Sequence, residues 1–229
     1  MTLATENSVQ AFAHQGYCTL AARFSPDEMD EVCNAFEGMR RSRAGIRHVL
    51  SHPAVASFAG DLRLMDLARE ILGPDASPFR ATLFDKSPDA NWLVAWHQDT
   101  ALPLAKKRDI PGWTAWSCKD GVHYAHAPAS ALQQVVAIRV HLDDSTLENG
   151  PLRVLPGTHQ RGVLADDEVH ALASEIEPVT CTVDRGGLVL MHPLLIHASS
   201  KCTSSQSRRV LHIEYASSRT LDGITLALC

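Results

Sequence analysis

The sequence predicts a mainly β protein of the α+β class, an antiparallel sandwich or jelly roll with a helical layer at its N-terminus. Two observations carry this prediction. Hydrophobic periodicity is close to 3.6 residues over the first 75 residues and changes to 2 from Phe79 onward. About eight short β-rich runs then follow one another without helical crossovers between them, which is typical of antiparallel folds.

Two helices in the first 75 residues have clear boundaries. Ser25-Pro26-Asp27-Glu28 is a capping box with proline at the first helical position. A second helix is expected from about Asp61 to Leu72, and Gly73 is a suitable residue to end it. Its buried stripe is expected to hold Leu64, Leu67, Ala68, Ile71 and Leu72.

The β-rich part of the chain is divided by turn signals such as Glu148-Asn149-Gly150 and Asp184-Arg185-Gly186-Gly187. The expected strands are residues 78–86, 93–99, 134–142, 152–155, 179–183, 188–191, 195–199 and 209–215. We therefore expect a single domain over residues 1–229, with a helical layer in 1–75 and a β core in 76–217.

These strands have two unlike faces. In residues 134–143, alternation places Val136, Ile138 and Val140 on one face, with Arg139 and His141 on the other. The polar face could look at water. Because amphipathic helices are available to cover the apolar face, we favour the alternative, in which the polar face lines a cavity.

Composition narrows the function classes. The chain has 229 residues, of which 45% are hydrophobic and 21% charged, which excludes a disordered chain. A net charge of −5 disfavours a nucleic-acid-binding role, and no apolar run approaches the ~20 residues that span a bilayer. The six cysteines are scattered without Cys-x-x-Cys spacing, which predicts neither a disulfide scaffold nor a zinc ribbon. We expect a cytoplasmic protein without nucleic-acid or membrane partners, and its oligomeric state stays open.

The central motif is Trp96-His97-Gln98-Asp99. Residues two apart on a strand point to the same side, so His97 and Asp99 can reach one metal ion. A third ligand must come from another strand, where His192 and His197 are the candidates. Two histidines and one carboxylate on one facial triangle suit Fe(II).

Two neighbouring arginines, Arg208 and Arg209, follow His197 in the sequence. A guanidinium matches a carboxylate through two parallel hydrogen bonds, so an arginine near a metal triad suits a dicarboxylic co-substrate. Strand alternation and its position after His197 favour Arg208 for this role. A one-residue change of register would bring Arg209 inward instead.

Over roughly Phe79–Tyr215 the sequence resembles the phytanoyl-CoA dioxygenase family of iron- and 2-oxoglutarate-dependent oxygenases. The resemblance is carried by Lys86, His97-Gln98-Asp99, Asn149-Gly150-Pro151-Leu152, Leu155-Pro156-Gly157-Thr158-His159, and Gly187 with His197-x-Ser199 and Arg208. It implies a double-stranded β-helix (a cupin-like jelly roll) in which His97, Asp99 and His197 bind Fe(II). It also implies that Arg208 binds 2-oxoglutarate and that Ser199 and Thr82 line its site.

The family reaction consumes O2 and 2-oxoglutarate and releases succinate and CO2. The resemblance thus implies a hydroxylase acting on an aliphatic carbon of a small molecule. In halogenating relatives a small residue replaces the carboxylate ligand, so the presence of Asp99 favours hydroxylation.

The substrate side is less constrained. Residues 100–132 are too long for a plain connection, and we interpret them as a lid. Trp113 and Trp116 could pack this lid or form a substrate wall, and Lys106 lies at its expected tip. Arg139 and His141 are the better candidates for holding a carboxylate or phosphate, which tilts the prediction towards an anionic substrate.

Two alternatives stay open at this point. The same barrel could be a non-catalytic module that binds metal and 2-oxoglutarate. It could also be a different cupin-type metalloenzyme, although such enzymes usually take more histidine ligands and need no distal arginine.

Overall fold

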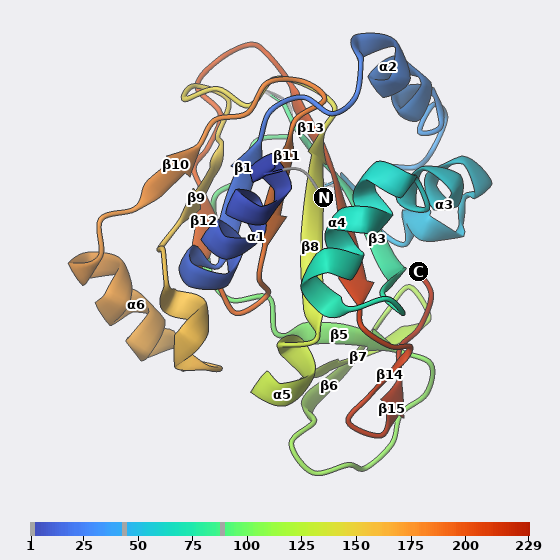
Figure 1. The fold of residues 1–229 in the computed structure, drawn as a ribbon, viewed down its shortest axis with the longest axis vertical. Helices are drawn as coiled ribbons and strands as arrows, with labels where there is room; N and C mark the ends of the chain where they lie inside the picture. Colours follow the sequence, from blue (N-terminus) through green and yellow to red (C-terminus); the bar gives the residue numbers. More distant parts are fainter. Residues whose placement is uncertain (1–2, 43–44, 88–89) are drawn as a thin grey trace.

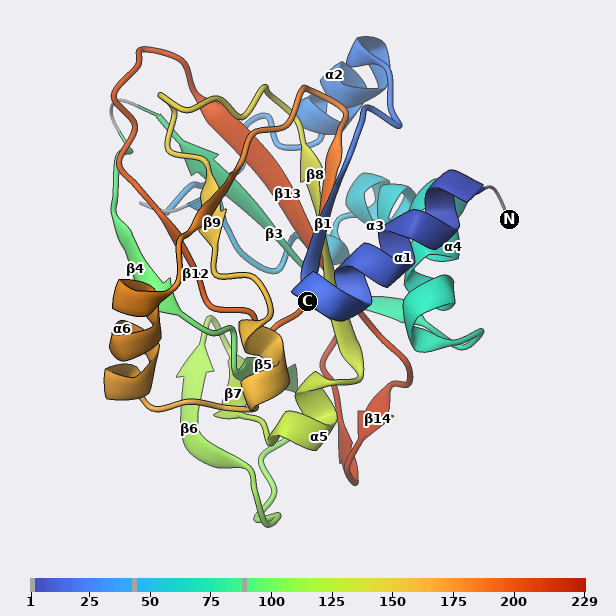
Figure 2. The same ribbon diagram turned by 60° about the vertical axis from the view of Figure 1, so that its left-hand side comes forward.

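The computed structural model describes residues 3–42, 45–87 and 90–229 and contains two antiparallel sheets that face each other (Figures 1 and 2). The larger sheet has the order β1 (Tyr17–Leu20), β11 (Leu188–Met191), β8 (Val135–His141), β13 (Arg208–Ala216), β3 (Ser77–Lys86) and β2 (Gly45–Ile46). The smaller sheet has the order β10 (Val179–Cys181), β9 (Leu152–Val154), β12 (His197–Ser199) and β4 (Val94–His97). Together they form a double-stranded β-helix, which confirms the predicted fold.

Helices cover the outer face of the larger sheet. They are α1 (Leu3–Gln15), α2 (Pro26–Asn34), α3 (Pro53–Ala59) and α4 (Leu62–Leu72), with the 3-10 turn η1 (Val49–Ser51) between α2 and α3. The capping box of α2 is formed as predicted, because Ser25 N donates to Glu28 Oε2 at 2.7 Å and Ser25 Oγ accepts from Glu28 N. Asp61 caps α4, which ends before Gly73.

The main core lies between these helices and the sheet. Met29 of α2, Val55 of α3 and Leu64 of α4 belong to one buried cluster with Ile138 of β8 and Ile213 of β13. Burial of such side chains stabilises the layer by roughly 1.5–3 kcal/mol for each residue. The apolar strand faces thus pack on helices, and the polar faces of β8 and β13 point into the interior between the two sheets.

The boundaries of the predicted layers need correction. Residues 17–20 and 45–46, which we assigned to a helical layer, are the edge strands β1 and β2 of the larger sheet. Residues 220–225 form a further hairpin, β14 (Thr220–Leu221) and β15 (Ile224–Thr225), beyond the expected end of the β core.

The predicted lid is also more regular than expected. Residues 101–126 form a three-stranded sheet in the order β5 (Ala101–Leu104), β7 (Val122–His126) and β6 (Thr114–Lys119), followed by α5 (Ala129–Leu132). Leu102, Leu104 and Leu132 bury themselves there with Phe79 and Leu226 in a second core cluster. This apolar anchorage explains why the segment packs as structure.

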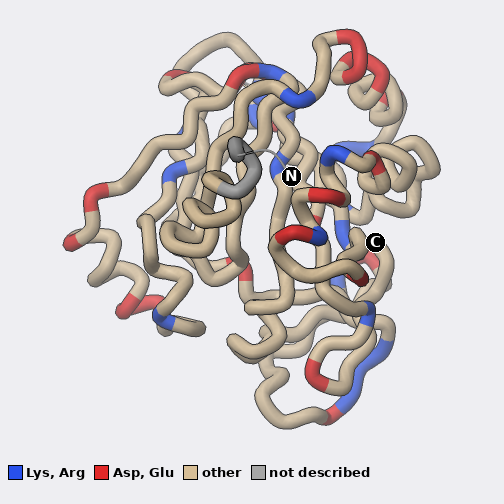
Figure 3. The backbone as a smooth tube through the Cα atoms, in the orientation of Figure 1, with Lys and Arg blue, Asp and Glu red and all other residues tan. Residues whose placement is uncertain are grey.

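The remaining elements are the 3-10 turn η2 (Thr158–Arg161) and α6 (Asp166–Glu175), which lies beside the smaller sheet. Acidic and basic residues are interspersed along the backbone (Figure 3). All six cysteines are free. Within the described ranges no helix has the length and apolar character needed to cross a bilayer.

Candidate active site

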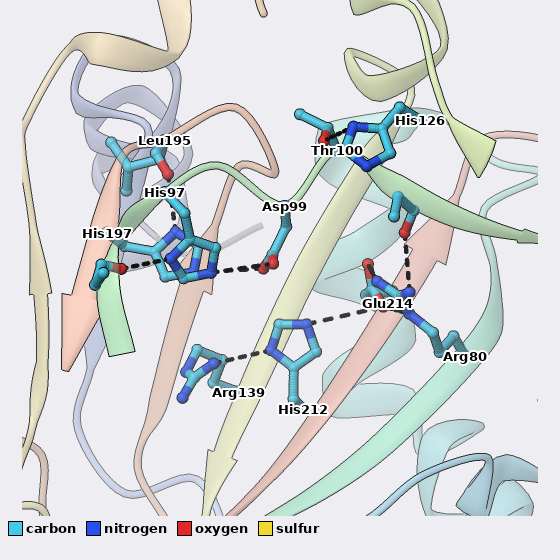
Figure 4. Close-up of polar contacts among 12 residues, drawn as sticks. Arg80, His97, Asp99, Thr100, His126, Arg139, Leu195, His197, His212 and Glu214 are labelled. Carbon is cyan, nitrogen blue, oxygen red and sulfur yellow. Dashed lines mark hydrogen bonds and ion pairs between the residues drawn. The ribbon is translucent and has the colours of Figure 1, made fainter. Parts of the chain in front are cut away.

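Three predicted ligands come together at one end of the smaller sheet (Figure 4). His97 ends β4 and His197 begins β12, and the two residues are direct antiparallel partners. Asp99 follows β4 and places its carboxylate opposite both rings, 3.6 Å from His97 Nε2 and 3.5 Å from His197 Nε2. One potential ligand atom of each residue lies within 4.8 Å of the other two. A single metal ion can therefore reach all three.

The two imidazoles are oriented by the backbone. His97 Nδ1 donates to Ala95 O at 2.8 Å, and His197 Nδ1 donates to Leu195 O at 2.9 Å. A carbonyl oxygen only accepts, so each neutral ring carries its proton on Nδ1 and leaves the Nε2 lone pair free. Both lone pairs face Asp99, which is the arrangement that a divalent ion needs.

In the metal-free site, electrostatics favour an ionised Asp99 and a neutral His197. Burial opposes ionisation of Asp99, but the two histidines outweigh it and hold the pKa of Asp99 well below its usual value. Burial lowers the pKa of His197 to about 4, although Asp99 acts against this effect. For His97, burial acts to lower the pKa, but the hydrogen bond and charge of Asp99 outweigh burial, so the net pKa is raised.

The backbone around the triad is tied to neighbouring loops. Asp99 N donates to Pro193 O at 2.9 Å. The side-chain amide of Gln98 donates to Gly162 O and Leu194 O, and its oxygen accepts from Leu164 N. Gln98 thereby fixes the segment that carries His97 and Asp99 to the loop before α6 and to the turn between β11 and β12.

The rival ligand His192 points elsewhere. Its Nδ1 accepts from Leu194 N at 3.1 Å, and its ring lies beside those of Phe12 and His159. His192 therefore serves the turn at Pro193, and the structure brings His197 to the triad.

A cavity extends from the triad between the two sheets. Besides the three ligands it is lined by Phe84, Lys86, Trp92, Val94, Arg139, Leu152, Ala198, Ser199 and Arg208. Its walls combine apolar side chains with cations, and such mixed walls are suited to a small anion.

Arg208 and Lys86 lie at the end of the cavity away from the triad. Arg208 is 3% exposed and donates through Nε to Asn149 O, while its buried Nη1 has no hydrogen-bond partner among the described residues. Lys86 Nζ donates to Ser199 Oγ at 2.7 Å and to Ser200 O at 2.5 Å. An incoming carboxylate would satisfy Nη1, so these residues fit the distal group of 2-oxoglutarate.

The register of β13 decides between the two arginines. Arg209 turns away from the cavity and pairs with Asp143, with 2.7 Å between Arg209 Nη2 and Asp143 Oδ1. Arg208 faces inward on the same side as His212 and Glu214. The structure therefore places Arg208 in the cavity and Arg209 outside it.

The other predicted site residues divide into two groups. Ser199 and Arg139 line the cavity. His141 is fully buried and is not among the described lining residues, and both its ring nitrogens are unpartnered among the described residues. Burial, followed by Arg139 and Arg208, holds the pKa of His141 well below its usual value. Thr82 pairs across the sheet with His212 and is not among the lining residues of the described chain.

The lid residues lie away from this cavity. Trp113 is buried in the second core cluster, and Trp116 packs against that cluster. Lys106 is exposed. The structure thus favours packing over a substrate wall for the two tryptophans, because Trp113 is buried in that cluster and the partly buried Trp116 packs against it.

Two contributors were missing from the predicted site. Lys86 belongs to the family motif, and alternation places it on the polar face of its strand with Thr82 and Phe84, but it is not among the predicted site residues. Gly150 had been interpreted as part of a turn. Its φ is +71°, and a Cβ there would lie 2.5 Å from Ser200 O and 3.0 Å from Lys86 Cδ. Only glycine lets the turn approach Lys86 so closely.

A double-stranded β-helix that brings two histidines and one carboxylate to one point, with an arginine in the adjoining cavity, defines the class of Fe(II)- and 2-oxoglutarate-dependent oxygenases. The family model for phytanoyl-CoA dioxygenase (PhyH) matches residues 12–210. The chain belongs to this family.

Relatives support the same assignment. The chain is 30% identical over 178 residues to L-proline trans-4-hydroxylase from Streptomyces griseoviridis, covering 66% of this chain and 59% of that protein. It is 26% identical over 168 residues to ectoine dioxygenase from Sphingopyxis alaskensis, covering 66% of this chain and 48% of that protein. The chain therefore spans only about half to three fifths of the length of these relatives.

Solved structures share the fold. EctD from S. alaskensis with bound Fe superposes with a TM-score of 0.70 at 21% identity, covering 94% of this chain and 76% of that one. The same protein has also been solved with 2-oxoglutarate and 5-hydroxyectoine, with a TM-score of 0.66 at 20% identity and coverage of 94% and 76%. Iron and 2-oxoglutarate are thus bound by proteins of this fold.

Proposed function

We propose that this protein hydroxylates an aliphatic carbon of a small molecule, using Fe(II), O2 and 2-oxoglutarate and releasing succinate and CO2. The observation that carries the proposal is the triad of His97, Asp99 and His197, whose ligand atoms converge on one point beside a cavity containing Arg208.

The proposal assigns metal binding to one end of the cavity and binding of the 2-oxoglutarate carboxylate to the other. His97, Asp99 and His197 would hold Fe(II), which when bound supplies the activation of O2. Arg208 would bind the distal carboxylate of 2-oxoglutarate, with Lys86 and Ser199 beside it. This separation of anchors orients the keto acid, so that its other end lies at the triad.

The apolar lining serves exclusion of water. Phe84, Trp92, Val94 and Leu152 surround the polar anchors. A dry cavity strengthens the pairing between Arg208 and a carboxylate and suppresses side reactions. The protein's share of the chemistry is thus positioning and protection of the reacting groups.

The prime substrate is proposed to be small and to carry a negative charge. Arg139, which lines the cavity, is the stronger candidate for binding that charge, and the buried His141 two residues further along β8 is the other. The names of the two curated relatives support small amino-acid-like molecules as a first panel. We further propose a cytoplasmic location without nucleic-acid or membrane partners, in keeping with six free cysteines and a net charge of −5.

The test is a coupled measurement of O2 uptake and succinate release with Fe(II) and 2-oxoglutarate. The proposal predicts turnover that requires both reagents and is lost in His97→Ala and Asp99→Ala. Metal-loaded protein that neither binds nor decarboxylates 2-oxoglutarate would reject the proposal. Turnover of a substrate without 2-oxoglutarate would instead favour another cupin-type metalloenzyme.

A further inference from the structure

A line of buried polar groups crosses the larger sheet beside the triad (Figure 4). Arg80 of β3 and Glu214 of β13 are direct cross-strand partners, and Arg80 Nη2 donates to Glu214 Oε1 at 2.6 Å. Arg139 of β8 and His212 of β13 are also direct partners, joined by Arg139 Nη1 and His212 Nδ1 at 3.0 Å. The four side chains lie on the interior face of three neighbouring strands.

The chemistry of these groups sets the direction of the hydrogen bonds. A guanidinium only donates, so His212 Nδ1 accepts from Arg139 and the neutral ring carries its proton on Nε2. That proton faces Glu214, whose Oε2 lies 3.8 Å from Nε2. Burial, followed by Arg139, holds the pKa of His212 well below its usual value, which matches a neutral ring.

Arg139 is held on one side and free on the other. Its guanidinium lies 5.5 Å from the centre of the Phe84 ring and is fixed at Nη1 by His212. Its Nε is buried without a hydrogen-bond partner among the residues that the structure describes, and the whole residue is only 7% exposed. Since Arg139 lines the same cavity as the triad, the unused donor marks a place for an acceptor.

Charge points to the kind of acceptor. Among the described residues that line the cavity, Lys86, Arg139 and Arg208 are cations and Asp99 is the carboxylate. A divalent metal and a dianionic keto acid cancel each other, and Asp99 offsets one cation, so positive charge remains. Burial, followed by the charge of Arg208, lowers the pKa of Lys86 to about 8, so Lys86 can lose its proton and its charge near neutral pH. A guanidinium cannot do so near neutral pH.

Glu214 does not meet this need. Its carboxylate is held by Arg80, which also donates through Nη1 to Ala101 O at 3.0 Å. The charge of Glu214 is therefore already paired, whereas no ion pair within 4.0 Å joins Arg139 to a described carboxylate. Burying a guanidinium that is not paired directly with a carboxylate is costly, and an anionic ligand in the cavity would offset that cost.

We propose that Arg139, positioned by His212, binds a carboxylate of the prime substrate beside the metal triad, so that the enzyme acts on small carboxylic acids. The inference rests on the proposed function. The same guanidinium could instead take the carboxylate next to the keto group of 2-oxoglutarate. The two sources share one chemistry and differ in which molecule loses affinity when Arg139 is changed.

Calorimetry under nitrogen separates these sources, with protein loaded with Fe(II). The first arm titrates 2-oxoglutarate into wild type, Arg139→Gln and the control Arg209→Gln. The second arm titrates small aliphatic carboxylates, each matched with its own amide, into the complex with Fe(II) and 2-oxoglutarate. L-proline and L-prolinamide form the first pair, since they differ only in that group.

We expect at least one carboxylate to bind wild type about tenfold or more tightly than its amide. Arg139→Gln should remove this preference while leaving the affinity for 2-oxoglutarate within about threefold of wild type. If Arg139→Gln instead lowers the affinity for 2-oxoglutarate by about tenfold or more, Arg139 binds the carboxylate of the keto acid, and the assignment to the prime substrate is wrong. The proposal would be overturned if Arg139→Gln leaves the affinity for 2-oxoglutarate unchanged and wild type binds no carboxylate more tightly than its amide.

His212 is tested as a positioning residue by paired variants. Asparagine can offer an oxygen where His212 Nδ1 accepts, whereas leucine cannot. We expect His212→Leu to show the same loss of carboxylate preference as Arg139→Gln, and His212→Asn to restore it. Equal preference in His212→Leu and wild type would refute the positioning role. If wild type binds no 2-oxoglutarate at all, the proposed function fails, and not this inference alone.

Discussion

Replacing Arg208 by glutamine tests the cavity most sharply, because the neighbouring residue is a natural control. Arg208 points inward with a buried Nη1 that has no partner in the described part of the chain, whereas Arg209 points outward and pairs with Asp143. The change removes the charge that would meet the distal carboxylate of 2-oxoglutarate. Losing one partner of a buried charge pair costs about 2–5 kcal/mol. A value of about 3 kcal/mol weakens binding roughly 150-fold.

Thermal unfolding under nitrogen with Fe(II) measures this loss. At a keto-acid concentration 100 times the wild-type Kd, binding stabilises the protein by about 2.7 kcal/mol. For a chain of this length that raises Tm by roughly 5–10 °C. A 150-fold weaker complex would be stabilised by only about 0.3 kcal/mol, or roughly 1 °C.

The ligand-free protein supplies a second readout. Arg208 is 3% exposed and its charge is uncompensated in the described site, so glutamine should leave Tm without ligand unchanged or higher. Arg209→Gln loses a partly exposed ion pair, which is worth about 0–1 kcal/mol, and should keep the full response to 2-oxoglutarate. An Arg208→Gln variant with the wild-type response, or an Arg209→Gln variant without it, would refute the assignment.

Three further predictions concern the supports of the site. Gly150→Ala should lower the free energy of unfolding by about 2–4 kcal/mol and lower the affinity for 2-oxoglutarate. The new Cβ would lie 2.5 Å from Ser200 O, and the φ of +71° is unfavourable for alanine. In chemical denaturation, Gly157→Ala, which has open space at φ +79°, should lose only about 1–2 kcal/mol; equal losses would contradict this contact. Lys86, whose pKa burial and then Arg208 lower to about 8, loses its charge as pH rises. Calorimetric affinity for 2-oxoglutarate should therefore fall between pH 7 and 9, and an unchanged slope in Lys86→Met would argue against this cause. Tyr215→Phe removes a hydroxyl that donates to Ala59 O of α3 at 2.8 Å, and urea unfolding should show a loss of stability of about 1–2 kcal/mol. An unchanged stability would show that this hydrogen bond does not stabilise the position of α3.

Periodicity carried most of the fold prediction. All eight predicted strands are present, because alternation over several residues reports directly on the two faces of a sheet. The edge strand β1 was not recognised because only one of its four residues, Leu20, is buried, so its burial does not alternate, and β2 has only two residues. In residues 101–126, β6 is mostly exposed and shows no alternation, so the three-stranded sheet could not be recognised locally.

The site was predictable where chemistry and alternation agree. His97 and Asp99 follow from their spacing, and the choice of Arg208 over Arg209 follows from strand phase. The role of Gly150 depends on a contact with residue 200 across the barrel, which no local pattern contains. The partnership of Arg139 with His212 likewise depends on which strands are neighbours.

The central claim is that His97, Asp99 and His197 hold one ferrous ion. Titration of Fe(II) into metal-free protein under nitrogen, followed by calorimetry, tests it most directly. The structure predicts one ion per chain in wild type and a loss of affinity of at least about 100-fold in Asp99→Ala, because changes to mere supporting residues of metal sites already cost about 10–100-fold. Equal affinity and stoichiometry in wild type and Asp99→Ala would contradict the account.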